Sequence, residues 1–292
     1  MDFNQLDLTE LDKDLSESQR SEWNAIYASY RSRSLLSGQV AGIDRNTLKF
    51  NDPNTGETIV KTISSLVVIP YRVKILIPEQ EIWYDESTQR PTHVLQSMRR
   101  GTIDYVITHI DRENDCCLAS RRLAMQIRRR YFLRHSPPES GKKTEARIIA
   151  VGRTHLLAEC GGFDITLSQR HLSYAMIEDL RDCYHPGEVY PAIIKGYDPD
   201  KDKLAISIKE AEPHPFDGAE LRHPVRCQRA SVITGKYRGG VFCRLEKGLD
   251  CMCTYSALQC DSDFHIGDQV MVAITKYNYD KKLIYGKIIA KW

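Results

Sequence analysis

The sequence has no apolar run of the roughly 18 residues that a membrane-spanning helix requires. The amino terminus opens Met1-Asp2-Phe3-Asn4 and has neither the basic start nor the apolar stretch of a secretory signal peptide. We therefore expect a cytoplasmic protein that does not interact with a membrane.

Signatures of catalysis and metal binding are also missing. No Gly-rich phosphate loop, His-Glu-x-x-His pattern or nucleophile elbow occurs. The nine cysteines are odd in number and include the adjacent Cys116 and Cys117, a poor basis for a disulfide framework. Cys251, Cys253 and Cys260 could suggest zinc, but Cys251 and Cys253 have the spacing of small apolar residues on one face of a strand. We expect no catalytic site, metal, cofactor or small-molecule substrate.

The charge is unevenly distributed, although the formal net charge is only +2. Acidic residues dominate the first twenty positions, where only Lys13 and Arg20 oppose them. The remaining chain is therefore basic, which favours a polyanionic partner. An ordinary solvated surface would give the same totals.

One pattern occurs three times: a glycine, an alternating apolar strand, a polar turn and a second strand. Its copies are Gly101–Ser120, Gly187–Ser207 and Gly267–Lys287. A repeat of this kind indicates modules in series. About five short strands per module predict a small closed barrel, because closure removes exposed sheet edges. The predicted fold is all-β, with three tandem five-stranded barrels, short connecting helices and a helical leader.

The same patterns divide the chain. Trp23 and Tyr30 lie on one face of a predicted leader helix that docks on the first module. An arginine-rich helix follows that module and ends before Pro137. Residues 82–98 are expected to form a long polar connection. The predicted segments are an acidic tail with a short helix (1–31), a divergent first module (32–120), a basic helix and linker (121–143), a second module (144–211), a linker (212–223) and a third module (224–292).

The stretch Gly240–Leu258 resembles the RNA-binding repeat of bacterial ribosomal protein S-one. Phe242 stands at the aromatic position of the second strand, with Tyr237 just before it. Ser256 matches the family's serine, and Thr254 stands where a histidine is usual. The second module resembles the family through residues 162–168 and 187–207, and the first through its first strand and residues 101–120.

This resemblance implies the oligonucleotide-binding (OB) fold, a five-stranded Greek-key barrel that carries single-stranded RNA across exposed aromatic rings. Each stacked base contributes about 1–3 kcal/mol, and basic residues follow the phosphates. We expect the third module to bind most strongly, since it keeps the aromatic positions. The predicted contacts are Tyr237, Arg238, Phe242, Arg244, Thr254, Tyr277 and Lys282 in the third module, Lys203 and His155 in the second, and Arg128 and Arg129 in the basic helix.

Two functions remain open at this point. The first is a non-catalytic protein that binds single-stranded RNA, with single-stranded DNA and the ribosome as further candidate partners. The alternative is a protein-interaction scaffold whose barrels dock on a partner in translation or nucleic-acid processing. Tyrosine and phenylalanine in small barrels also serve as core residues, and arginines on a helix also serve as a solvated face. The two functions differ in whether Tyr237, Phe242 and nearby basic residues share one exposed face.

Overall fold

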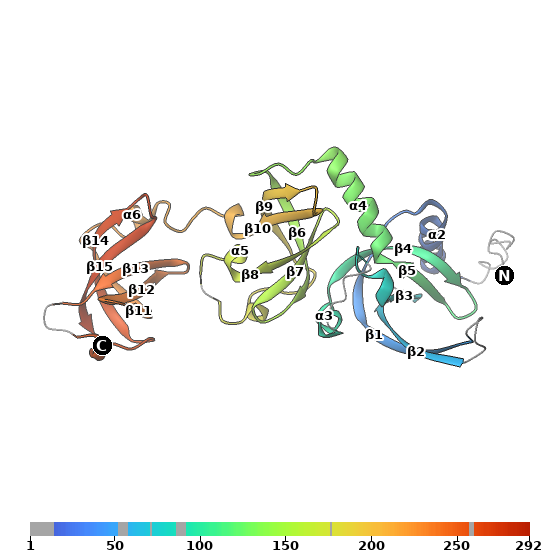
Figure 1. Cartoon of the computed structure of the whole chain (residues 1–292), viewed down its shortest axis with the longest axis horizontal. Helices are drawn as coiled ribbons and strands as arrows, with labels where there is room; N and C mark the ends of the chain where they lie inside the picture. The colour runs from blue at the N-terminus through green and yellow to red at the C-terminus, as the bar shows by residue number, and fades with distance from the viewer. Residues whose placement is uncertain (1–14, 52–57, 71, 86–91, 176, 257–259) are drawn as a thin grey trace. The chain divides into compact units, whose positions relative to one another are not determined.

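A computed structural model describes residues 15–51, 58–70, 72–85, 92–175, 177–256 and 260–292 (Figure 1). Most of the predicted acidic tail, up to residue 14, lies outside the described residues. The chain forms two compact units, one of Met1–Ser168 with Glu178–Ser207 and the other of Gln169–Ile177 with Ile208–Trp292. The predicted division into three modules with the boundaries given above stays a prediction.

The first unit begins with a closed barrel of strand order β1-β2-β3-β5-β4. Its closure depends on a parallel pairing of β3 with β5 and an antiparallel pairing of β1 with β4. The strands are β1 (Leu36–Asn51), β2 (Thr58–Val68), β3 (Lys74–Pro78), β4 (Thr102–Asp111) and β5 (Cys116–Ser120).

The predicted leader helix is present as α2 (Glu17–Ser32), which starts at a capping box on Ser16. Trp23 is buried in the core of the first barrel and Tyr30 packs against that core, as predicted. The buried Glu22 carboxylate accepts hydrogen bonds from the backbone N–H groups of Arg72 and Val73, at 3.2 and 3.1 Å. The helix is therefore part of the first barrel's structure.

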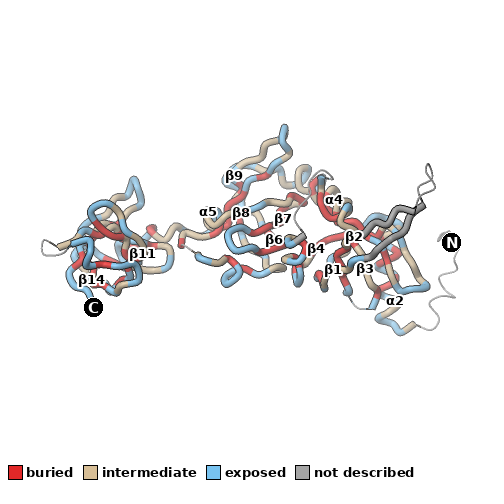
Figure 2. The backbone as a smooth tube through the Cα atoms, turned by 60° about the horizontal axis from the view of Figure 1, so that its bottom comes forward, coloured by how far each residue is buried: buried red, intermediate tan, exposed pale blue. Residues whose placement is uncertain are grey.

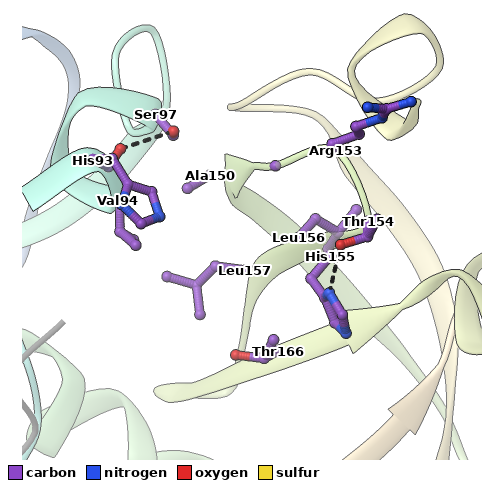
Figure 3. A pocket seen from close by; sticks show the side chains of 11 residues that line it. His93, Val94, Ser97, Ala150, Arg153, Thr154, His155, Leu156, Leu157 and Thr166 are labelled. Carbon is purple, nitrogen blue, oxygen red and sulfur yellow. Dashed lines mark hydrogen bonds between the residues drawn. The ribbon is translucent and has the colours of Figure 1, made fainter. Parts of the chain in front are cut away.

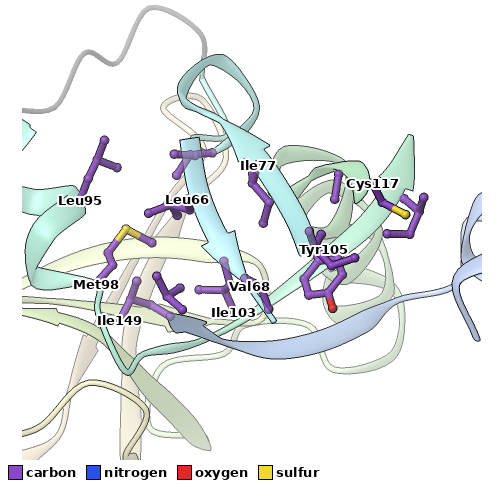
Figure 4. Packing of buried hydrophobic residues seen from close by; sticks show 14 of the residues in the cluster. Leu66, Val68, Ile77, Leu95, Met98, Ile103, Tyr105, Cys117 and Ile149 are labelled. Carbon is purple, nitrogen blue, oxygen red and sulfur yellow. The ribbon is translucent and has the colours of Figure 1, made fainter. Parts of the chain in front are cut away.

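The prediction of a long polar connection over residues 82–98 was wrong. After η2 (Glu79–Glu81), Ile82 and Trp83 are buried, and α3 (Thr92–Ser97) places Leu95 and Met98 in the same core (Figure 4). These four apolar residues are spaced too irregularly to form one strand or helix face in the sequence. They cover part of the barrel core.

A second five-stranded sheet follows in the first unit, in the order β10-β9-β6-β7-β8. Three five-stranded sheets are thus confirmed, and the first and third are closed. Within the described residues, no backbone ladder joins β8 to β10. The strands of this second sheet are β6 (Lys143–Val151), β7 (His155–Cys160), β8 (Phe163–Ser168), β9 (Val189–Asp198) and β10 (Lys203–Ser207). The short helices α5 (Gln169–Leu172) and η3 (Leu180–Asp182) lie between β8 and β9 in the sequence.

The arginine-rich helix is present as α4 (Arg121–His135), capped by Ser120. The β7–β8 turn rests directly on it. Gly162 has φ +83°, and a Cβ there would lie 2.5 Å from the Met125 carbonyl oxygen and 2.7 Å from the Arg129 nitrogen. Only glycine fits this backbone conformation and this close approach. The helix therefore holds the first barrel and the second sheet together within the first unit.

The second unit contains a closed barrel of order β11-β12-β13-β15-β14. Its strands are β11 (Gln228–Tyr237), β12 (Gly240–Glu246), β13 (Leu249–Thr254), β14 (Gln269–Asn278) and β15 (Leu283–Lys291). Buried and exposed residues alternate along them (Figure 2). Before the barrel lie η4 (Lys209–Ala211) and α6 (Ala219–Arg222), and η5 (Asp261–Asp263) precedes β14.

The core of this barrel explains two sequence patterns. Cys251 and Cys253 are fully buried on the inner face of β13, as packing predicts, whereas Cys260 is exposed. Phe216 and Ala219, from the segment predicted as a linker, are buried in the same core. Across the described part of the chain, no three His, Cys, Asp or Glu side chains are grouped to hold a metal ion, and no helix has the length and apolarity of a membrane span.

Candidate nucleic-acid interface

The outer face of the third barrel carries a row of neighbouring side chains across four strands. Phe242 on β12 is paired with Met252 on β13, Met252 with Tyr285 on β15, and Tyr285 with Lys276 on β14. Their strand neighbours, such as Val241 and Ile284, are buried inside, so the row points outward. We call Phe242, Met252, Tyr285 and Lys276 the outer row. Its three large side chains are half-buried, which leaves part of each in contact with solvent.

Tyr237 supports this row from the end of β11. Its ring centroid lies 5.1 Å from that of Phe242, with the planes tilted by 51°. The Tyr237 hydroxyl donates to the Cys253 carbonyl at 3.1 Å, and burial raises the pKa of Tyr237. A Cβ on Gly240 would lie 2.1 Å from that carbonyl oxygen and 2.5 Å from the Tyr237 hydroxyl. The absence of a side chain at Gly240 therefore lets the Tyr237 ring lie against the sheet and fix Phe242.

Basic groups surround the outer row. Lys276 Nζ lies 4.9 Å from the Tyr285 ring centroid, a cation–π contact. Arg244 is exposed on β12 and makes only a loose pair with Asp250 at 3.8 Å. Arg238 is exposed in the turn after Tyr237, and Lys287 is exposed beside Thr254 on the neighbouring strand. Residues 224–292 contain eleven Lys and Arg against six Asp and Glu. A strand of nucleic acid on this face would meet rings flanked by cations.

Two predicted contacts lie elsewhere in the third barrel. Tyr277 donates to the carbonyls of Ala219 and His223 at 3.2 and 2.6 Å, and burial raises its pKa to about 12. Lys282 pairs with Asp217 at 3.2 Å. Both residues therefore hold the segment before the barrel, and we leave them out of the proposed interface.

The arginines of α4 are largely committed to pairs within the first unit. Arg129 is 7% exposed and lies between the rings of Tyr84 and Phe163, at 3.5 and 3.9 Å from their centroids. Its guanidinium also pairs with Asp202. These contacts leave little of its surface for a phosphate.

The other arginines of α4 follow the same pattern, with two exceptions. Three of these others have carboxylate partners, which makes four pairs with that of Arg129, and Arg130 and Arg134 are exposed. The pairs are Arg121 with Asp164, Arg122 with Glu81, Arg128 with Asp104 and Arg129 with Asp202. The structure therefore uses Arg128 and Arg129 to join the modules, and the prediction that they contact RNA is not carried further.

The corresponding face of the second sheet, formed by β6, β7 and β8, is mostly covered by the first module. Ile149 and Leu157 belong to the core that contains Leu95 and Met98, and Figure 4 shows Ile149 beside Met98. Further along the face, the nearly buried Asp164 accepts two hydrogen bonds from Arg121, at 2.7 and 2.9 Å. This face therefore serves mainly as a contact between modules.

The remaining predicted residues, His155 and Lys203, occupy two separate cavities of the first unit. His155 lines a cavity of about 320 Å³ between α3 and the strands β6–β8. Lys203 lines one of about 330 Å³ together with Arg129 and three carboxylates, those of Asp85, Asp164 and Asp202. With Lys201 the lining holds three cations against these three carboxylates, so it carries no excess positive charge to attract a phosphate.

Met252, Lys276, Tyr285 and Lys287 are interface candidates that the sequence interpretation missed. Alternation along β15 provides a signal for Tyr285, because Ile284 and Gly286 face the core on either side of it. No local signal places it beside Met252, since that contact depends on the parallel pairing of β13 with β15.

Comparison with curated proteins gives partial matches. The chain is 27% identical over 158 residues to 4-hydroxy-3-methylbut-2-enyl diphosphate reductase of Clostridium tetani, covering 50% of this chain and 25% of that protein. It is 26% identical over 117 residues to small ribosomal subunit protein bS1 of Chlamydia trachomatis, covering 36% and 21%. With bS1 of Coxiella burnetii it shares 22% over 192 residues, covering 62% and 35%. The chain thus spans between about a fifth and about a third of the length of these relatives.

No family model matches the chain. Among solved structures, a complex of a/eIF2alpha, aDim2p and rRNA from Pyrococcus horikoshii aligns with 30% of this chain and 52% of its own, at 17% identity and a TM-score of 0.24. A multidomain protein with nucleic acid binding domains from Streptococcus pneumoniae aligns with 88% and 73%, at 11% identity and a TM-score of 0.19. The predicted resemblance is confirmed by sequence similarity: the chain is similar to small ribosomal subunit protein bS1 and, like the predicted repeats, is built from five-stranded sheets in series.

Proposed function

We propose that this protein binds single-stranded RNA without catalysis, mainly through the outer row of the third barrel. The observation that carries the proposal is the alignment of Phe242, Met252 and Tyr285 across three adjacent strands, with solvent on one side. Stacking on rings needs no particular base, since every base has a π-face. Similarity to bS1, which covers 62% of this chain in one relative, supports the proposal.

The contacts divide by chemistry. Phe242 and Tyr285 supply stacking surfaces, and Met252 lies between them as a flexible, polarisable spacer. We assign phosphate contacts to Arg238, Arg244 and Lys287, which are exposed, and a hydroxyl contact to Thr254, which is paired with Lys287. Tyr237 acts mainly by positioning Phe242. Because the reductase match covers only 25% of that protein, we assign no reaction to this chain.

The test is a fluorescence anisotropy titration of the full chain with labelled single-stranded RNA at low and moderate salt. Wild type should bind more weakly as salt rises, because phosphate contacts release counterions. The affinity of a Phe242→Ala, Tyr285→Ala double variant for this RNA should be lower than that of the wild type by roughly 30-fold or more, because each stacked ring contributes about 1–3 kcal/mol. The matched control is Tyr279→Ala, which removes an exposed ring outside the outer row. Equal affinities for the double variant and the control would contradict the proposal.

The alternative function, a protein-interaction scaffold, is favoured by one observation. The β6–β8 face of the second sheet is used for protein contact inside this chain, which shows that such a face can dock on protein. The scaffold alternative would apply if RNA binding were absent at low salt while the chain still captured a protein from translation or nucleic-acid processing.

A further inference from the structure

We infer that the first unit holds a second, separate site, a pocket for one nucleotide between α3 and the strands β6–β8. The pocket goes beyond the proposed function, because it lies in the other unit and shares no residue with the outer row. Its volume of about 320 Å³ is near the lower end of the range for small-molecule sites. A single nucleotide suits that volume better than a continuous strand.

The shape of the pocket follows from how the modules pack. The first module packs on Ile149 and Leu157 of the β6–β8 face. The open remainder is bounded on one side by α3. Figure 3 shows His93 and Val94 on the α3 side, His155 and Thr166 on the strand side, and Leu157 between them. The site thus needs both modules of the first unit.

The lining matches a flat heteroaromatic ring. Val94, Ala150 and Leu157 supply an apolar floor, and the imidazoles of His93 and His155 provide two flat polar walls. Both histidines are exposed at the mouth. The Thr154 hydroxyl lies 2.9 Å from His155 Nδ1, which orients the ring and leaves Nε2 to a ligand. An unstacked base would find stacking and edge hydrogen bonds here.

The charge around the pocket favours an anion. Arg153 lines the rim and is exposed, while none of the eleven lining residues is acidic. Arg181, at 2.5 Å, is the main cause of the lowered pKa of Asp179, and Arg153 contributes less to it. A base in the pocket with its phosphate at Arg153 therefore uses both parts of the lining, which identifies the ligand class as a nucleotide.

The test is titration of the full chain with adenosine 5′-monophosphate, adenosine and ribose 5-phosphate, followed by calorimetry and by the imidazole NMR signals. We expect the nucleotide to bind and to shift the His155 signals, and ribose 5-phosphate to bind far more weakly. His155→Ala should weaken nucleotide binding about fivefold or more, the effect of losing one stacked base. His135→Ala, an exposed histidine on α4 outside the pocket, should leave it unchanged. Arg153→Ala should weaken the binding of the nucleotide but not that of the nucleoside.

Absence of a His155 shift at millimolar nucleotide, equal effects of His155→Ala and His135→Ala, or equal binding of ribose 5-phosphate would each overturn the site. A titration with a short 5′-phosphorylated oligonucleotide distinguishes two sources of the ligand, the end of a nucleic-acid strand and a free nucleotide. Tighter binding than the free nucleotide assigns the pocket to the end of a strand, and equal binding assigns it to a free nucleotide; both results support the pocket. Retention of nucleotide binding by Phe242→Ala, Tyr285→Ala separates this site from the outer row. A negative result for the nucleotide pocket would therefore leave the proposed RNA binding by the outer row untouched, and the reverse also holds.

Discussion

The junction between the first barrel and the second sheet depends on the buried pair of Arg121 and Asp164. Removing one partner should lower the free energy of unfolding of the first unit. Arg121 is 2% exposed and donates to both Asp164 carboxylate oxygens, at 2.9 and 2.7 Å. It also donates to the Ile82 carbonyl at 3.0 Å. Burial works to lower the pKa of Arg121, but the carboxylates of Asp164, Glu159 and Asp104 together outweigh it and raise that pKa above its ordinary value. The guanidinium therefore stays charged inside the protein.

Asp164→Ala leaves that charge buried, with the Ile82 carbonyl and the Met125 sulfur as its remaining hydrogen-bond acceptors and with Glu159 and Asp104 acting on it without a hydrogen bond. Loss of one partner of a buried pair costs about 3–5 kcal/mol. In a unit of this size that corresponds to a fall in the melting temperature of about 10 °C. The matched control is Arg181→Ala, which breaks an exposed pair with Asp179 in the same unit and should cost less than about 1 kcal/mol.

The assay is urea unfolding of the full chain followed by tryptophan fluorescence. Trp23 and Trp83 are buried in the first unit, whereas Trp292 is 58% exposed, so the large signal change reports the first unit. The double variant Arg121→Met, Asp164→Leu should recover most of the lost stability, because well-packed apolar side chains often replace such a pair. A loss below about 1 kcal/mol for Asp164→Ala, or a double variant no better than the single one, would refute the reasoning.

Two further variants probe single contacts. Gly240→Ala places a Cβ 2.1 Å from the Cys253 carbonyl oxygen; by overpacking it should destabilise the second unit by about 1–3 kcal/mol in calorimetry, whereas Gly196→Ala, with open space around it, serves as control. Glu22→Gln weakens the acceptor for the Val73 N–H and should destabilise the first unit by about 1–2 kcal/mol in urea; no change in the midpoint would show that the carboxylate charge contributes nothing there.

Much of the fold could be predicted because its signals are local. Strand alternation and turn glycines specify the five-stranded sheets. The spacing of Trp23 and Tyr30 specifies α2, and the proline after His135 limits α4. The buried residues Leu95 and Met98 were missed because they lie in and directly after a short helix, in a segment with many polar residues. Their burial results from packing on strands that are distant in the sequence.

The site could be predicted only in part, since it depends on register and on partners. Phe242 was identified from its own strand, but Tyr285 joins it only through the parallel pairing of β13 with β15. In the sequence, Arg129 had no visible carboxylate partner and was therefore predicted to contact RNA. Its partner, Asp202, is distant in the sequence and lies directly before β10. Basic residues on a helix thus indicate a polyanion only when no carboxylate reaches them in the fold.

The modules differ because a barrel face can pack against protein or stay open, and its outward residues must match that use. On β7 the outward positions carry Leu157, which is buried in the core shared with the first module, and Glu159, which is buried and pairs with Arg147 on β6. On β12 they carry Phe242 and Arg244, which keep contact with solvent. Contiguous apolar side chains that keep contact with solvent are a feature of interaction sites. The rings of the third barrel therefore suit the proposed RNA ligand, whereas the leucine of the second sheet is buried by its neighbouring module.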